Sequence, residues 1–108
     1  MSVPQPVDDT GPRHSSSVSV GRILLEVCVE SVDDALTAYH HGADRLELNT
    51  ALVLGGLTPS MGVIREVRRA VPLPLMVMIR PRSGGFHYSP NEFMVMHRDA
   101  EVALQAGA

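Results

Sequence analysis

Apolar and polar residues alternate along Arg45–Asn49, where leucines occupy positions 46 and 48 and polar residues occupy the odd positions. This period of two is typical of a β-strand with one apolar and one polar face. Two further strands are predicted, Ile23–Cys28 and Leu75–Arg80. The first is almost wholly apolar, so we expect it to be buried on both faces.

A helix is predicted after each strand, and each begins at a serine that can cap its free N–H groups: Ser31, Ser60 and Ser89. Glycines at positions 42 and 107 are expected to end the first and third helices. In the second helix we expect Val63, Ile64 and Val67 to face inward, and a charged face to be solvated, made of Arg65, Glu66, Arg68 and Arg69.

Strand and helix therefore alternate three times, which predicts an α/β fold with a parallel sheet and right-handed βαβ connections. Three units cannot close a barrel of about 250 residues, so the predicted class is a (β/α) barrel of the TIM type that is incomplete. The strand expected after Gly107 is missing, and we expect a fragment of a longer fold or a truncated gene product. Residues 1–20 are rich in proline and serine and are predicted to be a disordered leader, with the barrel part at 21–108.

Composition narrows the classes of partner. Among 108 residues the formal net charge is −3 and no basic stripe appears, so we expect no nucleic-acid partner. One cysteine excludes an intrachain disulfide and a four-cysteine zinc site. No apolar run suits a membrane span and no secretory signal is apparent, so we expect a cytoplasmic protein without a membrane partner.

Several segments in order resemble the N-terminal part of the CutC copper homeostasis family: Leu25–Cys28, Ala35–Ala38, Gly42–Leu48, Gly55–Ser60, and Ile79–Arg82 with Gly84–Phe86 and Tyr88–Ser89. The resemblance covers nearly everything after residue 22. It implies a TIM-type barrel, a cytosolic location and a link to copper handling. It does not supply a reaction.

The resemblance also points to copper ligands. Cys28 matches a family cysteine considered as a copper ligand, and His87 is the next candidate, since copper takes thiolate, thioether and imidazole ligands. Family members often carry a cysteine where this chain has Asn49. As alternatives, Cys28 can be a small buried hydrophobe and His87 a solvated loop residue. Met76 and Met78 share one face of their strand, and we favour packing for both.

Strand parity also predicts a polar cluster at the carboxyl mouth of the barrel, the usual ligand-binding end of such folds. Its expected members on the strands are Glu26, Cys28, Glu47, Asn49 and Arg80, with Arg82 and His87 on the loop above. Acids beside arginines in a partly buried mouth are typical of binding sites, and an arginine pair suits an anion. The alternative is a structural network in which Glu26, Glu47 and Arg80 satisfy one another.

The function expected from the sequence is participation in copper homeostasis, with copper bound near this mouth. The alternative is an uncharacterised TIM-barrel enzyme or a small-anion binder that uses the Glu/Arg cluster. No nucleophile–base pair stands out, so the catalytic residues are unknown. The expected partner is a copper ion or a small anionic ligand, and a homo-oligomer is left open. A third reading is that the short chain is inert.

Overall fold

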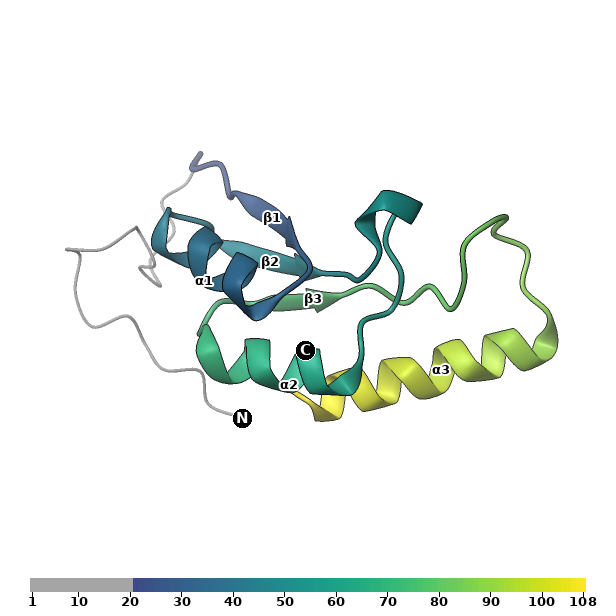
Figure 1. Ribbon diagram of the computed structural model, residues 1–108. Helices are drawn as coiled ribbons and strands as arrows, with labels where there is room; N and C mark the ends of the chain where they lie inside the picture. Colours follow the sequence, from purple (N-terminus) through teal and green to yellow (C-terminus); the bar gives the residue numbers. More distant parts are fainter. Residues whose placement is uncertain (1–20) are drawn as a thin grey trace.

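Parallel strands and helices alternate along residues 21–108, the part of the chain that this computed structural model describes (Figure 1). The elements are β1 (Glu26–Val29), α1 (Val32–His40), β2 (Arg45–Leu48), the 3-10 helix η1 (Leu52–Leu54), α2 (Met61–Ala70), β3 (Leu75–Val77) and α3 (Pro90–Gln105). β2 lies between β1 and β3 in the sheet. The predicted incomplete parallel (β/α) arrangement is confirmed. The predicted leader, residues 1–20, lies outside the described residues.

One face of the sheet is apolar and is covered by the helices. Leu46 pairs with Val27 on one side and Leu75 on the other, and Leu48 pairs with Val29 and Val77. Leu46 and Leu48 are 1% and 0% exposed, as their alternation with polar residues predicts. They belong to a core that also takes residues from the helices, including Ala35, Ile64, Val67 and Ala103.

The opposite face of the sheet is open in the described part of the chain. Glu26 is paired with Arg45, and Cys28 with Glu47, which in turn is paired with Met76. Glu26 and Cys28 are exposed, so the expectation that the first strand is buried on both faces is wrong. The reason is that all the core contacts of the strands are made on one side.

The first and third strands are shorter than the sequence pattern suggests. Ile23 precedes β1 and is 88% exposed, while β3 ends at Val77 rather than at Arg80. β2 has only four residues, so few residues of either neighbouring strand can pair with it. Beyond β3, Met78 N–H still donates to Leu48 O at 3.0 Å, which continues the direction of the strand for one more residue.

The predicted helix starts are confirmed. The Ser31, Ser60 and Ser89 hydroxyl oxygens each accept a hydrogen bond from the backbone N–H three residues later, at 3.0, 3.2 and 3.1 Å. Glu92 completes a capping box at α3, since its carboxylate accepts from Ser89 N–H at 2.8 Å. These caps satisfy N–H groups that have no partner within the helix.

Arg68 was expected to be solvated, and that prediction is wrong because the side chain is 8% exposed. Its guanidinium donates to Val71 O at 2.7 Å, to Leu73 O, and to Gly107 O at 3.2 Å. Arg68 thus satisfies carbonyl oxygens just after α2 and at the end of α3. It joins the two helix ends through one buried cation.

Gly107→Ala should lower the free energy of unfolding by about 1–3 kcal/mol. Gly107 has a φ of +115°, and a Cβ there would overlap Cγ and Cδ of Arg68. Urea unfolding followed by circular dichroism measures the change. Gly85→Ala is the control, because a Cβ at Gly85 meets nothing within 4 Å. Equal stability of the Gly107→Ala and wild-type chains would contradict this account of Arg68.

Candidate functional site

Cys28, Glu47 and Met76 stand side by side on the open face of the sheet, one from each strand, and are called here the cross-strand row. The Cys28 thiol donates to Glu47 Oε2 at 3.2 Å. Cys28 is exposed, and Met76 is 49% exposed. The row therefore presents a thiol, a carboxylate and a thioether to anything that approaches this face.

The surroundings of Cys28 hold it in the protonated form. Its pKa is raised, chiefly because the thiol donates a hydrogen bond to Glu47, with smaller contributions from burial and from the negative charges of Glu47 and Glu26. A thiolate is the form that attacks electrophiles and binds metals. A cation that binds Cys28 must therefore displace a proton.

Asn49 fixes the position of Glu47. It is fully buried at the end of β2, and its Nδ2 donates to Glu47 Oε2 at 3.0 Å and to Glu47 O at 3.2 Å. The same carboxylate oxygen thus accepts from both Asn49 and Cys28. Asn49 Oδ1 has no hydrogen-bond partner and faces Gly56, which packs against it.

The predicted mouth does not form a Glu26–Glu47–Arg80 network. Glu26 pairs instead with Arg45, its cross-strand neighbour, in a half-exposed ion pair. Such a pair contributes about 0–1 kcal/mol to stability. Because Glu26 shares the open face with the cross-strand row, its charge still acts on Cys28.

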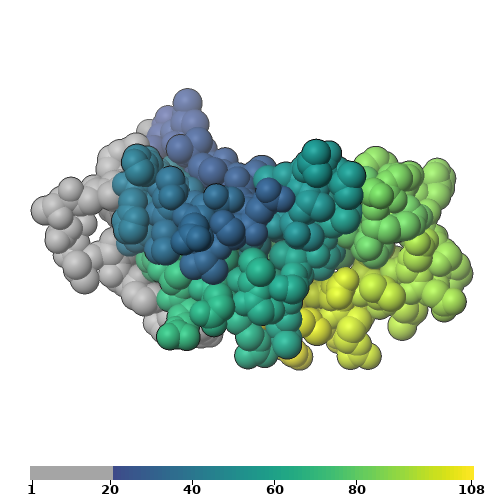
Figure 2. All heavy atoms as spheres, viewed as in Figure 1, coloured from purple at the N-terminus to yellow at the C-terminus, as the bar shows by residue number. Residues whose placement is uncertain are grey.

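Arg80 binds carbonyl oxygens of two loops. It donates to Leu54 O at 2.8 Å, to Gly56 O at 3.3 Å and to Gly84 O at 3.2 Å, and its guanidinium lies 5.0 Å from the centre of the Phe86 ring. The loop after β2 is thereby joined to the loop after β3, and the two lie side by side as teal and green atoms in Figure 2.

The loop after β2 is also held on its other side and at its base. Leu52 N–H donates to Glu30 Oε1 at 2.7 Å, which connects the loop to the end of β1. Thr58 N–H donates to Arg80 O at 3.0 Å, and Arg80 N–H donates back to Thr58 Oγ1 at 2.7 Å. All three carboxyl-end loops are linked by these bonds.

Arg82 lies away from the cross-strand row. It pairs with Glu92 at the start of α3 and donates to Gly85 O at 2.8 Å and His87 O at 2.7 Å. Hydrogen bonds from Arg82 and from Ser89 N–H lower the pKa of Glu92. The contact to His87 uses its backbone only, and the His87 side chain is exposed.

Of the residues predicted from the sequence, the structure thus brings together Cys28, Glu47 and Asn49. Arg80, Arg82 and His87 belong to the loops, and among the described residues no three His, Cys, Asp or Glu side chains are grouped as a metal site. Alternation along the strand placed Met76 on one face with Met78 and Arg80, and packing was expected for it. The structure instead leaves Met76 49% exposed beside Glu47.

Glu47→Gln should lower the pKa of Cys28, because it removes the negative charge and weakens the acceptor of the thiol proton. Thiolate forms as pH rises, so alkylation by iodoacetamide should reach half its maximal rate at a lower pH than in the wild type. Cys28 is the sole cysteine, which makes the assay specific. Glu66→Gln on α2 should leave the profile unchanged, and an unchanged profile in Glu47→Gln would refute the assigned cause.

Gly56→Ala should destabilise the fold by at least about 2 kcal/mol. Gly56 has a φ of +95°, and a Cβ there would lie 3.2 Å from Asn49 Cγ and overlap its Oδ1. Thermal or urea unfolding measures the loss. Gly62→Ala should be neutral or stabilising, since a Cβ at this helical position has only Ser60 Oγ nearby, at 3.8 Å. Similar losses in both variants would argue against the tight Gly56–Asn49 contact.

Comparisons with known proteins show which family the sequence of this chain matches. The model of the CutC family matches residues 23–108. A protein of Homo sapiens called copper homeostasis protein cutC homolog is 52% identical over 85 residues, which is 79% of this chain and 31% of that protein. A CutC family protein of Treponema denticola is 45% identical over 86 residues, 80% of this chain and 35% of its own length. The chain thus spans about a third of these relatives.

A solved structure agrees with the fold. The crystal structure of a CutC protein from Streptococcus agalactiae superimposes with a TM-score of 0.74 at 36% sequence identity. The match covers 81% of this chain and 43% of the streptococcal one. Family model, sequence relatives and backbone agree over the same strand–helix units, and this chain belongs to the CutC family.

Proposed function

We propose that this chain takes part in copper homeostasis and binds copper on the open face of its sheet, with Cys28 as the principal ligand. The name of the human relative supports the first part of the proposal. The cross-strand row supports the second, because it exposes the thiol of Cys28 and the thioether of Met76 on the same face, one on each side of Glu47. Their exposure on one face of the sheet is the observation that carries the proposal.

The ligand types on this face suit Cu(I), which prefers the soft sulfur donors of cysteine and methionine. Glu47 is a harder donor, and it already accepts hydrogen bonds from Cys28 and Asn49. It favours a cation electrostatically while it keeps the thiol protonated, so copper affinity should rise with pH as the thiol is more easily deprotonated. His87 is the second candidate ligand, from the loop after β3.

A Cu(I) titration against a competing chromogenic chelator tests the proposal. Cys28→Ser should weaken Cu(I) binding at least about tenfold, since even residues that only support a metal ligand commonly contribute that much. Met76→Leu should weaken it less, because a thioether is a weaker donor than a thiolate. His87→Ala tests the loop histidine in the same assay.

Met94→Leu is the matched control, since Met94 is 62% exposed on α3, away from the cross-strand row. Its affinity should equal that of the wild type. Equal affinity of Cys28→Ser and wild type would exclude Cys28 as a ligand. Equal loss in Met76→Leu and Met94→Leu would remove Met76 from the proposed site.

The alternative function, a small-anion binder or enzyme that uses Arg80 and Arg82, has less support. Both guanidinium groups donate to loop carbonyl oxygens, and Arg82 also pairs with Glu92. An anion would have to compete with these partners. No helix in residues 21–108 is long and apolar enough to span a membrane. The cytosolic location and self-association considered from the sequence stay predictions.

A further inference from the structure

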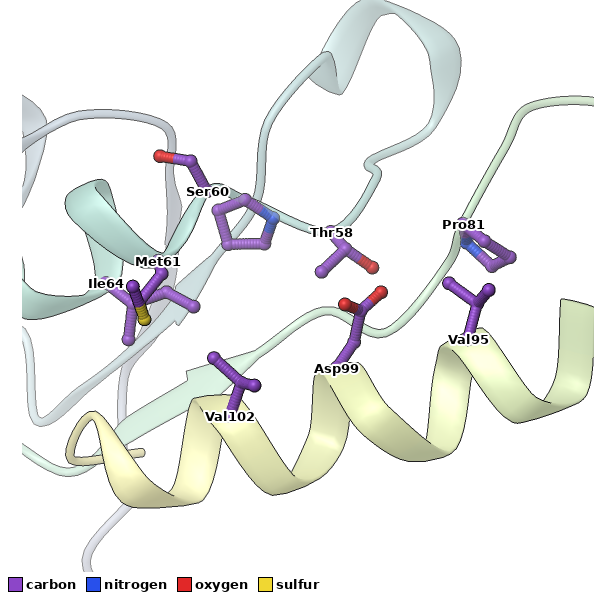
Figure 3. Close-up of a pocket in the computed structure, with 9 residues that line it drawn as sticks. Thr58, Ser60, Met61, Ile64, Pro81, Val95, Asp99 and Val102 are labelled. Atoms are coloured by element: carbon purple, nitrogen blue, oxygen red, sulfur yellow. The ribbon is translucent and has the colours of Figure 1, made fainter.

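A cavity lies between the start of α2 and the middle of α3, and its volume is about 290 Å³ (Figure 3). Its walls are apolar over most of their area, with Pro59, Met61 and Ile64 on one side and Val95 and Val102 on α3. Ile64 is 2% exposed, whereas Met61 and Val95 are 49% and 50% exposed. The cavity is therefore apolar at its base and open to solvent at its rim.

One carboxylate enters this apolar space. Asp99 lies between Val95 and Val102 on the lining face of α3, and its side chain points across the cavity toward Thr58 (Figure 3). Positions 95, 99 and 102 share one face of a helix, so a third apolar residue would be the ordinary choice at 99. Asp99 is half-buried there.

The charge of Asp99 has no protein partner in the described part of the chain, where no ion pair or hydrogen bond of its side chain occurs. The two hydroxyl groups that line the cavity bond to the backbone instead: Thr58 Oγ1 accepts from Arg80 N–H, and Ser60 Oγ accepts from Val63 N–H. The first turn of α2 also borders the cavity, and its positive dipole end makes the carboxylate tolerable without neutralising it.

These features select one class of ligand. A neutral apolar molecule would desolvate the carboxylate without compensation, and an anion would be repelled. A divalent metal needs several oxygen donors, and among residues 21–108 no three His, Cys, Asp or Glu side chains are grouped so that they could hold a metal ion. The volume lies near the lower end of small-molecule sites, at about 300 Å³.

We propose that the α2–α3 cavity binds a small organic cation, with a primary ammonium group on Asp99 and a short apolar body against Ile64, Val95 and Val102. The ammonium donates to the carboxylate, while the apolar part leaves water for the valine and isoleucine surface. This site is separate from the cross-strand row, and the proposal does not depend on copper.

Binding of n-hexylammonium to the chain tests this, by titration calorimetry and by NMR shifts of the methyl groups of Ile64, Val95 and Val102. Asp99→Asn keeps the shape of the side chain and should weaken binding at least about tenfold, the usual effect of losing a charged hydrogen bond. The neutral probe 1-hexanol should bind the wild type at least about tenfold more weakly than n-hexylammonium does, because it lacks the charge that pairs with Asp99. Asp33→Asn on α1 changes the net charge equally and should leave binding unchanged.

The site would be supported by NMR shifts confined to the residues that line the cavity, together with weaker hexylammonium binding in Asp99→Asn but not in Asp33→Asn. Three results would overturn it: no binding of hexylammonium to the folded wild type, equal binding of hexanol, or equal binding by Asp99→Asn. Circular dichroism of each variant shows that it is folded. Where the first of these results comes with binding of lysine-bearing peptides, it would favour a protein partner instead.

Discussion

The pairing register of three short parallel strands is the constraint on which the rest of the structure depends. Side chains alternate between faces, and the helices cover only one of them, so each strand position is assigned either to the core or to the open face. A slip of β2 by one residue would exchange Leu46 and Leu48 for Arg45 and Glu47 in the core. The buried leucines therefore determine where Cys28, Glu47 and Met76 lie.

The open face combines two opposing electrostatic effects. The charges of Glu26 and Glu47 attract any cation, yet they also stabilise the proton on Cys28. Metal binding on this face is thus an exchange of a cation for a proton, in which the same carboxylate acts on both. Asn49 keeps that carboxylate in place from inside the protein, since it is fully buried and donates to Glu47.

Local signals in the sequence sufficed for much of the fold. The serine caps of the helices need only neighbouring residues, and the leucine alternation in β2 needs only one strand, so both could be predicted. The burial of Arg68 could not, because its partner Gly107 is 39 residues away and comes near only after α2 and α3 pack.

Part of the candidate site could also be predicted from the sequence. Parity placed Glu26, Glu47 and Cys28 on one face, and the structure agrees. The partners of Arg80 could not be predicted, because backbone carbonyl oxygens leave no signature in a sequence and depend on how the loops turn. The openness of the face could not be predicted either, since it depends on which layers surround the sheet.

The linked carboxyl-end loops have a consequence for how this part of the molecule forms. Glu30 and Leu52 are 22 positions apart, and Arg80 and Leu54 are 26 apart, so these bonds close large segments of chain. Contacts of that span cost more entropy than helical turns and are slower to form. The helices should consequently assemble first and the carboxyl-end loops last. These loops are therefore the part of the molecule most readily remodelled without unfolding the core.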